Sequence, residues 1–340
     1  MLKSVWFDIT NTPQVHFLLA VRSMLCDKFS DFLFSVREFS ETISLIEKSV
    51  DKSSLIIINS SYGTTKFQKA ISLIRRFCFI NARNIEYDLS ISCGSDSAIW
   101  HSFINRKKSI AFGDNDTAKQ WTYSRFVDFA FFPDAIDAEV LNRQGLKNKF
   151  YLYHGFKEDI YLSYFKPDDK FMDKVPYKNY VVLRPENIHA NYLNNRKVTS
   201  IVPELLSRLL SKGLKVIFLP RYDADREYAT GLNNVFIPAE PLNGLDLCFN
   251  ADAVLTGAGT FAREAACLGV PSFSFYAGKQ LLAVDKKLIN DKKMIHSRDP
   301  DYLVQKVLVS KKNSPDIGTS VAVREELNEK LIEKISSFWD

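Results

Sequence analysis

Apolar positions alternate between two spacings along almost the whole chain. Short strand-like runs are followed by longer segments whose apolar residues recur every three or four positions, which is typical of helices. In the first half, strands are predicted at residues 3–9, 32–36, 55–58, 87–92, 109–112, 127–132 and 149–153, and helices at 15–29, 38–48, 65–80 and 96–105. Strands that alternate with helices predict parallel sheets joined by right-handed crossovers.

The same alternation restarts in the second half. Strands are predicted at residues 180–183, 215–219, 235–237, 253–256 and 272–275, and helices at 198–211, 245–250, 261–268, 279–289, 301–310 and 321–338. We therefore expect an α/β fold with two doubly wound, Rossmann-like parallel-sheet domains facing a central cleft. The expected domains are residues 1–155 and 176–320, with a connector at 156–175 and a C-terminal helix at 321–340 that can pack back on the first domain.

Composition narrows the class of protein. The 340 residues are 46% hydrophobic and 25% charged, which excludes disordered and collagen-like chains. A formal net charge of +5 is too small to predict a nucleic-acid partner. The five cysteines show no CxxC spacing, so neither a disulfide framework nor a zinc site is expected. With no apolar run of membrane-spanning length and no signal-peptide pattern, the sequence predicts a cytoplasmic protein.

Residues 253–273, AVLTGAGTFAREAACLGVPSF, have the clearest functional pattern. A strand leads through the turn GAGT directly into a helix. Glycines let the backbone approach a phosphate, and the free N–H groups at a helix start favour a diphosphate. A carboxylate one turn later, Glu264, could accept hydrogen bonds from ribose hydroxyls. The alternative is a turn whose glycines serve only a positive φ, and the incomplete GxGxxG pattern argues against an NAD site.

This segment resembles the donor-nucleotide motif of GT-B glycosyltransferases, such as the MurG-type N-acetylglucosaminyltransferase, and of the UDP-N-acetylglucosamine 2-epimerases. The segments FDITNTPQVHF, REFSET, GSDSA, FGDNDTAK and YHGFKEDIYL resemble a prokaryotic family of unknown function that is grouped with that superfamily. The resemblance implies a GT-B fold and a nucleotide-sugar donor. It places Ala258, Gly259 and Thr260 on the diphosphate and Glu264 on the ribose, and we expect the whole turn from Gly257 to Thr260 to hold the diphosphate.

Two arginines follow predicted strands of the second half. Arg184 begins the loop RPENIHANY and could bind a phosphate in a bidentate manner, or it could form a surface salt bridge. Arg221 is a second candidate after the next strand. Asp223 and Asp225 have the DxD spacing of a metal motif, but they precede a short helix and are interpreted as a solvated helix start. No metal is expected, and no cofactor beyond a UDP-sugar as co-substrate.

Three residues of the first half are candidates for acid or base chemistry. His16 could deprotonate an acceptor hydroxyl, because imidazole titrates near neutral pH, or it could be a structural hydrogen-bonding residue. In the resemblance, the catalytic-loop histidine aligns more naturally with Gln14. Asp96 and Asp114 follow the fourth and fifth strands, where carboxylates can act at a sugar carbon or cap the helices that follow.

These features predict a metal-independent glycosyltransferase of cell-surface polysaccharide or glycoconjugate synthesis. One alternative is a 2-epimerase that uses Asp96 and Asp114. Its second-domain signature has a histidine where Leu183 stands, and only His189 could replace it. The other alternative is a non-catalytic nucleotide-sugar-binding subunit.

Residues 64–80 predict an amphipathic helix. Its apolar face is predicted to hold Phe67, Ile71, Ile74 and Phe77, beside the basic residues Lys66, Lys69, Arg75 and Arg76. Such a helix can bind the inner membrane surface, where a lipid-linked acceptor would reside. The alternative is an ordinary helix that covers the sheet and has a solvated basic edge. The expected partners are thus a nucleotide-sugar donor and a sugar or lipid-linked acceptor.

Overall fold

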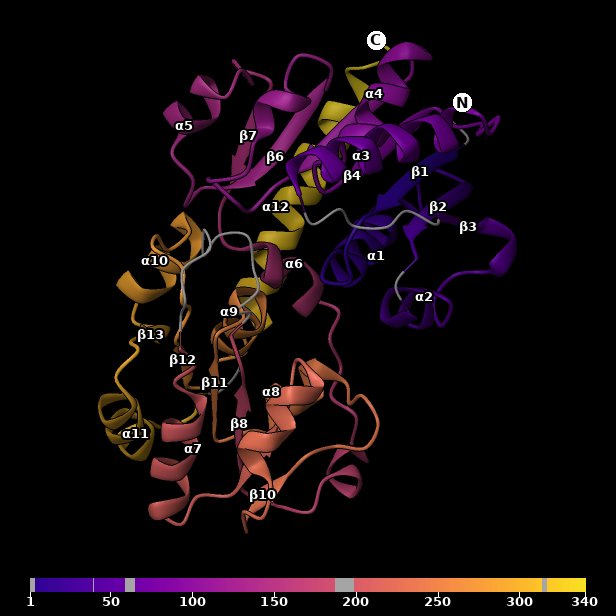
Figure 1. Ribbon diagram of the computed structural model, residues 1–340. Helices are drawn as coiled ribbons and strands as arrows, with labels where there is room; N and C mark the ends of the chain where they lie inside the picture. Colours follow the sequence, from indigo (N-terminus) through magenta and orange to yellow (C-terminus); the bar gives the residue numbers. More distant parts are fainter. Residues whose placement is uncertain (1–3, 39, 59–64, 187–198, 314–316) are drawn as a thin grey trace. The chain divides into compact units, whose positions relative to one another are not determined.

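The computed structural model describes residues 4–38, 40–58, 65–186, 199–313 and 317–340. The chain divides into two compact units, which Figure 1 shows in ribbon form. Unit 1 contains Met1–Tyr161 and Ser320–Asp340, and unit 2 contains Leu162–Thr319. The end of the chain therefore belongs to the same unit as its beginning.

Unit 1 is built on a seven-stranded sheet in which every strand pair is parallel, in the order β3-β2-β1-β4-β5-β6-β7. Its strands are β1 (Ser4–Ile9), β2 (Asp31–Arg37), β3 (Leu55–Ile58), β4 (Leu89–Ser92), β5 (Lys108–Phe112), β6 (Phe129–Pro133) and β7 (Phe150–Tyr153). The buried strands β1 and β4 lie in the middle of the sheet, where both of their faces are covered. The strand order reverses between them, which is where ligands bind in open α/β sheets.

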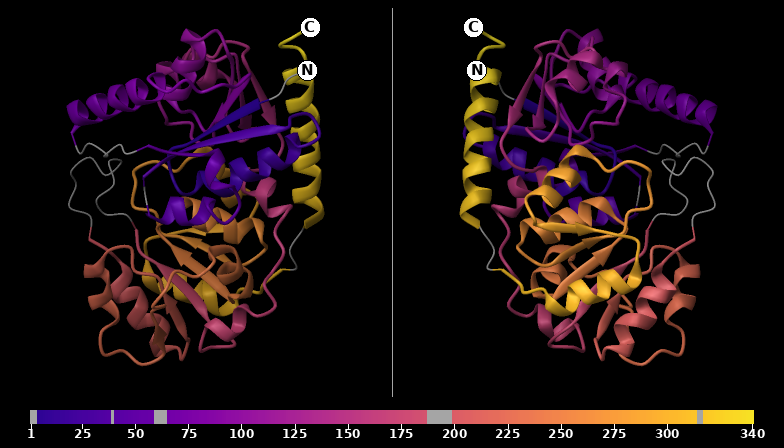
Figure 2. Two further views of the ribbon diagram at one scale, coloured as in Figure 1. Left: turned by 90° about the vertical axis from the view of Figure 1, so that its right-hand side faces the viewer. Right: turned by 90° about the vertical axis from the view of Figure 1, so that its left-hand side faces the viewer.

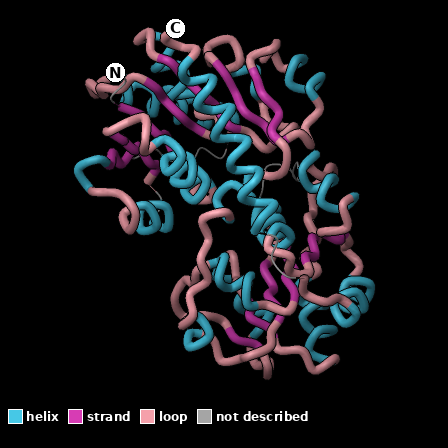
Figure 3. The backbone as a smooth tube through the Cα atoms, turned by 180° about the vertical axis from the view of Figure 1, so that it is seen from behind, coloured by secondary structure: helices cyan, strands magenta, loops and turns pink. Residues whose placement is uncertain are grey.

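Helices connect and cover these strands. They are α1 (Gln14–Leu25), α2 (Ser40–Ile46), α3 (Lys66–Asn81), α4 (Asp96–Ile104), α5 (Ala138–Arg143), α6 (Lys157–Leu162) and α12 (Ile317–Ser336). The sequence pattern did not predict the short helix α5. Helix α12 packs on unit 1, where Tyr151 of β7 donates a hydrogen bond to Glu326 at 2.8 Å. Figure 3 shows α12 as the long helix near the C-terminus.

Unit 2 contains a six-stranded parallel sheet in the order β10-β9-β8-β11-β12-β13. Its strands are β8 (Val181–Arg184), β9 (Val216–Phe218), β10 (Val235–Phe236), β11 (Ala253–Thr256), β12 (Ser272–Ser274) and β13 (Met294–His296). Strand β13 was not predicted, because it has only two apolar residues and follows the charged run 291–293. It forms one edge of the sheet.

The helices of unit 2 are α7 (Val202–Ser211), α8 (Gly244–Asn250), α9 (Gly259–Cys267), α10 (Ala283–Asn290) and α11 (Pro300–Val309). Leu205, Leu209, Phe218 and Leu255 are fully buried between sheet and helices. Burial of such side chains is the main favourable term in folding. Among the residues described, no helix is long and apolar enough to cross a membrane.

Candidate functional site

The predicted nucleotide-binding residues of unit 2 lie at one edge of its sheet. Thr256 at the end of β11 pairs in register with Arg184 at the end of β8. On its other side, Thr256 pairs with Ser274 at the end of β12, and Ser274 pairs with His296 at the end of β13. Four neighbouring strands therefore place polar residues in one row at their carboxyl ends, the edge where open α/β sheets bind ligands.

The turn between β11 and α9 contains glycines because of close packing. Neither Gly257 nor Gly259 has a positive φ, so the alternative of a turn that only needs that backbone angle is wrong. A Cβ at Gly257 would lie 2.3 Å from the Cβ of Glu186 and 2.4 Å from its Cα. The N–H of Gly257 donates to the carbonyl of Arg184 at 3.1 Å. The first glycine thus lets the end of β11 lie directly against the chain that follows β8.

Helix α9 begins without a side-chain cap. Its N-cap residue is Ala258, and no side chain accepts a capping hydrogen bond there. The N–H of Ala258 itself donates to Thr256 Oγ1 at 2.9 Å. The first N–H groups of a helix lack partners within the helix and carry partial positive charge. The start of α9, at Gly259 and Thr260, is therefore suited to an anionic group such as a diphosphate.

A buried arginine that the sequence analysis did not single out lies behind this turn. Arg263 is 3% exposed and forms an ion pair with Asp285 of α10, with 3.1 Å between Nη1 and Oδ1. Its Nη2 donates to Thr260 Oγ1 at 3.3 Å. Because a buried charge is stable only when it is paired, the two side chains tie α9 to α10. They also hold a guanidinium next to the first turn of α9.

Arg184 and Glu264 both interact electrostatically with the buried thiol of Cys248. The guanidinium carbon of Arg184 is 5.7 Å from the ring centroid of Phe261, a cation–π contact. Burial raises the pKa of the Cys248 thiol; Glu264 raises it further, and Arg184 lowers it. Both side chains are half-buried. This region thus offers a cation that suits phosphate and a carboxylate that suits hydroxyl groups.

Arg221 follows β9, and its backbone is held by a helix start. Its N–H donates to Asp225 Oδ2 at 2.8 Å, and Asp225 is 5% exposed at the beginning of the 3-10 helix Asp223–Ala229.

The other aspartate of the DxD spacing, Asp223, is solvent-exposed, with 3.7 Å between its Oδ1 and Arg226 Nε. The DxD spacing thus belongs to a helix start. In the described ranges, no group of three or more His, Cys, Asp or Glu residues is placed to hold a metal ion.

Two further basic residues reach this edge from β13, the strand that the pattern did not predict. Arg298, just after β13, donates to Glu186 Oε1 at 3.1 Å and to the carbonyl of Phe275 at 2.9 Å. His296 is half-buried, and burial lowers its pKa, so the imidazole is neutral near pH 7. Arg298 therefore stabilises the chain after β8, and His296 adds a neutral imidazole to the row of strand ends. His189, named above, lies outside the described residues.

In unit 1, His16 lies in the first turn of α1, at the carboxyl edge of the sheet. Its ring stacks on Tyr161 of α6, with 5.9 Å between centroids and 28° between planes. Burial lowers the pKa of His16, so the ring is neutral at pH 7 and can accept a proton. Gln14, the position that the resemblance aligns with a histidine, instead accepts the N–H of Thr10 at 2.8 Å. Gln14 therefore shapes the loop before α1.

Helix α6 links Asp114 to the same group of residues. Lys157 Nζ lies 2.6 Å from Asp114 Oδ2, and only 10% of the lysine side chain is exposed. Lys157 and Tyr161 are four residues apart, so they project from one face of α6, where one contacts Asp114 and the other His16. The alternative that Asp114 caps a helix is wrong, because the next helical segment, Gln120–Thr122, has a later residue as its N-cap.

Asp96 lies after β4 on the same edge. It accepts a hydrogen bond from Thr122 Oγ1 at 2.6 Å, and burial raises its pKa. The N-cap of α4 is Ser95, whose Oγ accepts the N–H of Ala98 at 3.5 Å. The alternative of Asp96 as the cap is therefore wrong by one residue. Asp96 thus contacts Thr122, whereas α6 joins His16 to Asp114.

A buried carboxylate near the reversal of strand order was missed. Asp8 of β1 is 0% exposed, accepts hydrogen bonds from Ser35 and Ser95, and forms an ion pair with Arg76 of α3. Arg76 is 1% exposed, and its Nε and Nη1 have no hydrogen-bond partner among the described residues. Asp8 thus connects β1, β2, α3 and α4. The signal in the sequence is a charged residue inside the apolar run SVWFDI.

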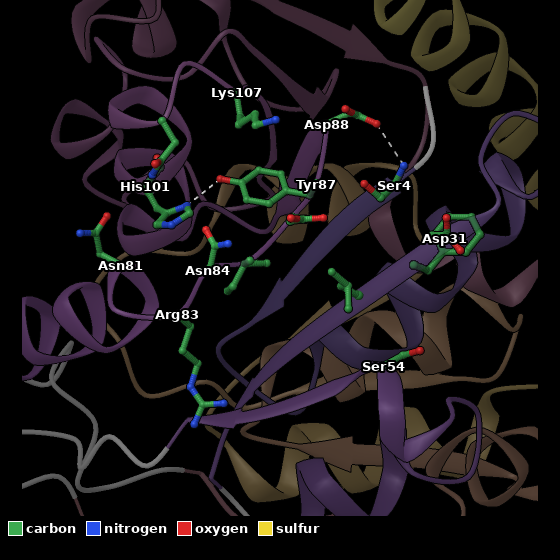
Figure 4. Close-up of a pocket in the computed structure, with 15 residues that line it drawn as sticks. Ser4, Asp31, Ser54, Asn81, Arg83, Asn84, Tyr87, Asp88, His101 and Lys107 are labelled. Carbon is green, nitrogen blue, oxygen red and sulfur yellow. Dashed lines mark hydrogen bonds between the residues drawn. The ribbon is translucent and has the colours of Figure 1, made fainter. Parts of the chain in front are cut away.

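A cavity of about 760 Å³ opens at the opposite, amino-terminal edge of the unit 1 sheet (Figure 4). Its lining includes Ser4 and Asp31, the first residues of β1 and β2, and Lys107, just before β5. Tyr87 Oη and His101 Nδ1, which also line it, share a hydrogen bond of 2.6 Å. None of the predicted site residues line this cavity, so it is separate from the carboxyl-edge clusters.

Solved structures share this fold along nearly the whole chain. The UDP-GlcNAc 2-epimerase of Methanocaldococcus jannaschii, in complex with UDP-GlcNAc and UDP, has a TM-score of 0.70 at 14% identity, over 97% of this chain and 99% of that chain. The glycotransferase of kitacinnamycin has a TM-score of 0.59 at 10% identity, over 98% of both chains. The likeness concerns the fold, which is the GT-B type with two Rossmann-like units.

Within this class, the chain belongs to the family described as protein of unknown function DUF354, which matches residues 3–338. A relative from Methanocaldococcus jannaschii, Uncharacterized protein MJ0665, is 25% identical over 322 residues, which are 89% of this chain and 90% of the relative. The family resemblance and the fold class expected from the sequence motifs are both confirmed.

Proposed function

We propose that this protein is a glycosyltransferase that uses a UDP-sugar as donor, in the synthesis of a cell-surface polysaccharide or glycoconjugate. The observation that carries the proposal is the carboxyl edge of unit 2. There the uncapped start of α9 and Arg184 provide positive charge. Arg263 lies behind the turn, which is packed too closely to hold larger side chains at its glycines. Glu264 follows one helical turn later. This order suits a diphosphate and then a ribose.

The same groups can stabilise the leaving group. When the bond between sugar and diphosphate breaks, negative charge develops on the diphosphate. The α9 start and Arg184 would stabilise that charge, with Arg221 as a second guanidinium after the neighbouring strand. Because these groups supply positive charge, the proposal includes no metal ion and no other cofactor. The likeness in fold to an enzyme bound to UDP-GlcNAc and UDP supports a uridine nucleotide.

His16 is the proposed base that takes the proton of the acceptor hydroxyl. Its lowered pKa keeps the ring neutral, and stacking on Tyr161 holds its orientation. Asp114 is less suited to this role, because its carboxylate already forms an ion pair with Lys157 at 2.6 Å. The pair of Asp114 and Lys157 is better suited to hydrogen bonds that orient the acceptor.

Two variants test the nucleotide site. Glu264→Ala is expected to lower the affinity for UDP about tenfold, because it removes charge-assisted hydrogen bonds to the ribose. Gly259→Val is expected to abolish measurable binding, since a Cβ there would already lie 3.1 Å from Arg263 Nη1. Titration calorimetry with UDP measures both effects. Glu240→Ala, which changes an exposed carboxylate of the same unit, is the matched control. Unchanged affinity in Glu264→Ala and Gly259→Val would contradict the site.

A hydrolysing 2-epimerase is the second candidate, favoured by the fold likeness and by Asp96 and Asp114 at neighbouring strand ends. Burial raises the pKa of Asp96, which favours the protonated form that an acid needs. Such an enzyme would release UDP and N-acetylmannosamine from UDP-GlcNAc alone, whereas a transferase requires an acceptor. Leu183, where the epimerase pattern has a histidine, favours transfer. Binding of UDP without turnover of any donor and acceptor would instead indicate a non-catalytic subunit.

A further inference from the structure

Helix α3 of unit 1 has an apolar stripe that no described part of the chain covers. Phe67 is 73% exposed and Ile74 57% exposed. Ala70 and Cys78 are also exposed and fall on the same side of the helix, at spacings of three and four residues. We call these four residues the α3 outer face. In Figure 2, α3 is the purple helix at the margin of unit 1.

The opposite side of α3 makes the contacts that the fold needs. Arg76 and Ile80 are buried there against the sheet. Phe77, at the border between the two sides, packs its ring on Trp100 of α4 with 6.2 Å between centroids. The single apolar face predicted from the sequence is therefore split, because Phe77 packs inward while Phe67 points to solvent. The α3 outer face is apolar although it does not cover the sheet. Packing within the described part of unit 1 therefore does not explain why these positions are apolar.

The charges on α3 have one sign. Its 16 residues contain four lysines and arginines and no aspartate or glutamate. Arg75 is exposed directly beside Ile74 and flanks the α3 outer face, whereas Lys69, seven residues before the buried Arg76, lies on the side that faces the sheet. An exposed apolar stripe flanked by a basic side chain, on a helix without acidic residues, is complementary to a surface that is both apolar and negatively charged. An anionic bilayer has both properties at the depth of its headgroups.

We propose that the α3 outer face binds the surface of an anionic phospholipid bilayer. Phe67 and Ile74 would enter the headgroup region, and Arg75 would contact lipid phosphates. In a parallel sheet, a helix begins at the carboxyl edge, so Phe67, in the first turn of α3, lies toward the edge that carries His16. If the proposed function holds, this position brings a lipid-linked acceptor toward the proposed base. Binding to the bilayer itself does not depend on that activity.

Co-sedimentation with vesicles tests the proposal. We expect the full chain to bind vesicles of phosphatidylcholine with about 30% phosphatidylglycerol at low salt, and to bind pure phosphatidylcholine much more weakly. The double variant Phe67→Ser/Ile74→Ser is expected to lower binding by at least about tenfold, and Arg75→Glu by about tenfold. All variants should keep the wild-type affinity for UDP, so this test fails or succeeds separately from the proposed function.

Matched controls come from unit 2. Val309→Ser removes another apolar side chain that is 70% exposed, and Lys286→Glu reverses another exposed charge. Both are expected to bind vesicles like the wild type. Three results would overturn the proposal: equal binding to neutral and anionic vesicles, variants of α3 that bind like the controls, or self-association in solution that only the Phe67→Ser/Ile74→Ser variant loses. The last result would show that a second copy of the chain covers the face.

Discussion

A His16→Ala variant is expected to lower the rate constant of sugar transfer by about 10²- to 10⁴-fold, the usual contribution of a general base. The affinity for UDP should not change, because the groups proposed to hold the nucleotide lie in unit 2. Steady-state kinetics with a UDP-sugar and an acceptor, together with calorimetric UDP binding, separates the two effects. His154→Ala is a suitable control, because His154 is 78% exposed and pairs with Glu326.

The pH dependence sharpens this test. Burial lowers the pKa of His16 from its ordinary value of 6.5, so the neutral base is present throughout the neutral range. The rate is expected to fall only as the pH drops below 6.5 and through the lowered pKa. The same lowered pKa affects stability. The contribution of neutral His16 to the free energy of unfolding is fully present above pH 6.5 and is lost as the pH falls through the pKa that His16 has in the folded protein. An acid limb that persists unchanged in His16→Ala would exclude this base.

Gly257→Ala is expected to weaken UDP binding by on the order of a hundredfold, although it adds a single methyl group. That carbon would lie 2.4 Å from the Cα of Glu186, a backbone atom that cannot rotate away. The ends of β8 and β11 must separate, which breaks the hydrogen bond from Gly257 to Arg184 and displaces the start of α9. Calorimetry with UDP measures the affinity, and urea unfolding measures the accompanying loss of stability.

The control for this substitution is Gly244→Ala. Gly244 begins α8 in the same unit, and a Cβ there would meet its nearest atom, in Phe261, at 3.4 Å, an ordinary contact. Its φ is not positive, so alanine fits the backbone. Gly244→Ala should therefore bind UDP like the wild type. Equal effects of the two substitutions would indicate that neither glycine has a special role at the nucleotide site.

Most of the fold followed from local patterns. The runs at β1, β3 and β11 are mostly apolar and are bounded by polar or turn residues, and hydrophobic periodicity is a property of neighbouring positions. Strand β13, Met294–His296, was missed because it has only two apolar residues after the charged run 291–293, and it is recognised by its pairing with β12. Helix α5, Ala138–Arg143, was also missed.

The candidate site was predicted only in part. The turn at Gly257 could be found, because glycines between a strand and a helix form a contiguous motif. Arg263 and Asp8 were missed, because their roles depend on partners that are distant in sequence, Asp285 and Arg76. Nothing in a linear pattern states that these charges are buried.

The sequence by itself determined the alternation of strands and helices, the GT-B class and the family, because these depend on periodicity and on contiguous motifs. Only the tertiary structure decided why Gly257 is glycine, which aspartate pairs with Lys157, and which side of α3 remains exposed. The physical reason is that close approach, ion pairing and burial are set by residues far apart in the chain. These contacts exist only once the sheets have assembled.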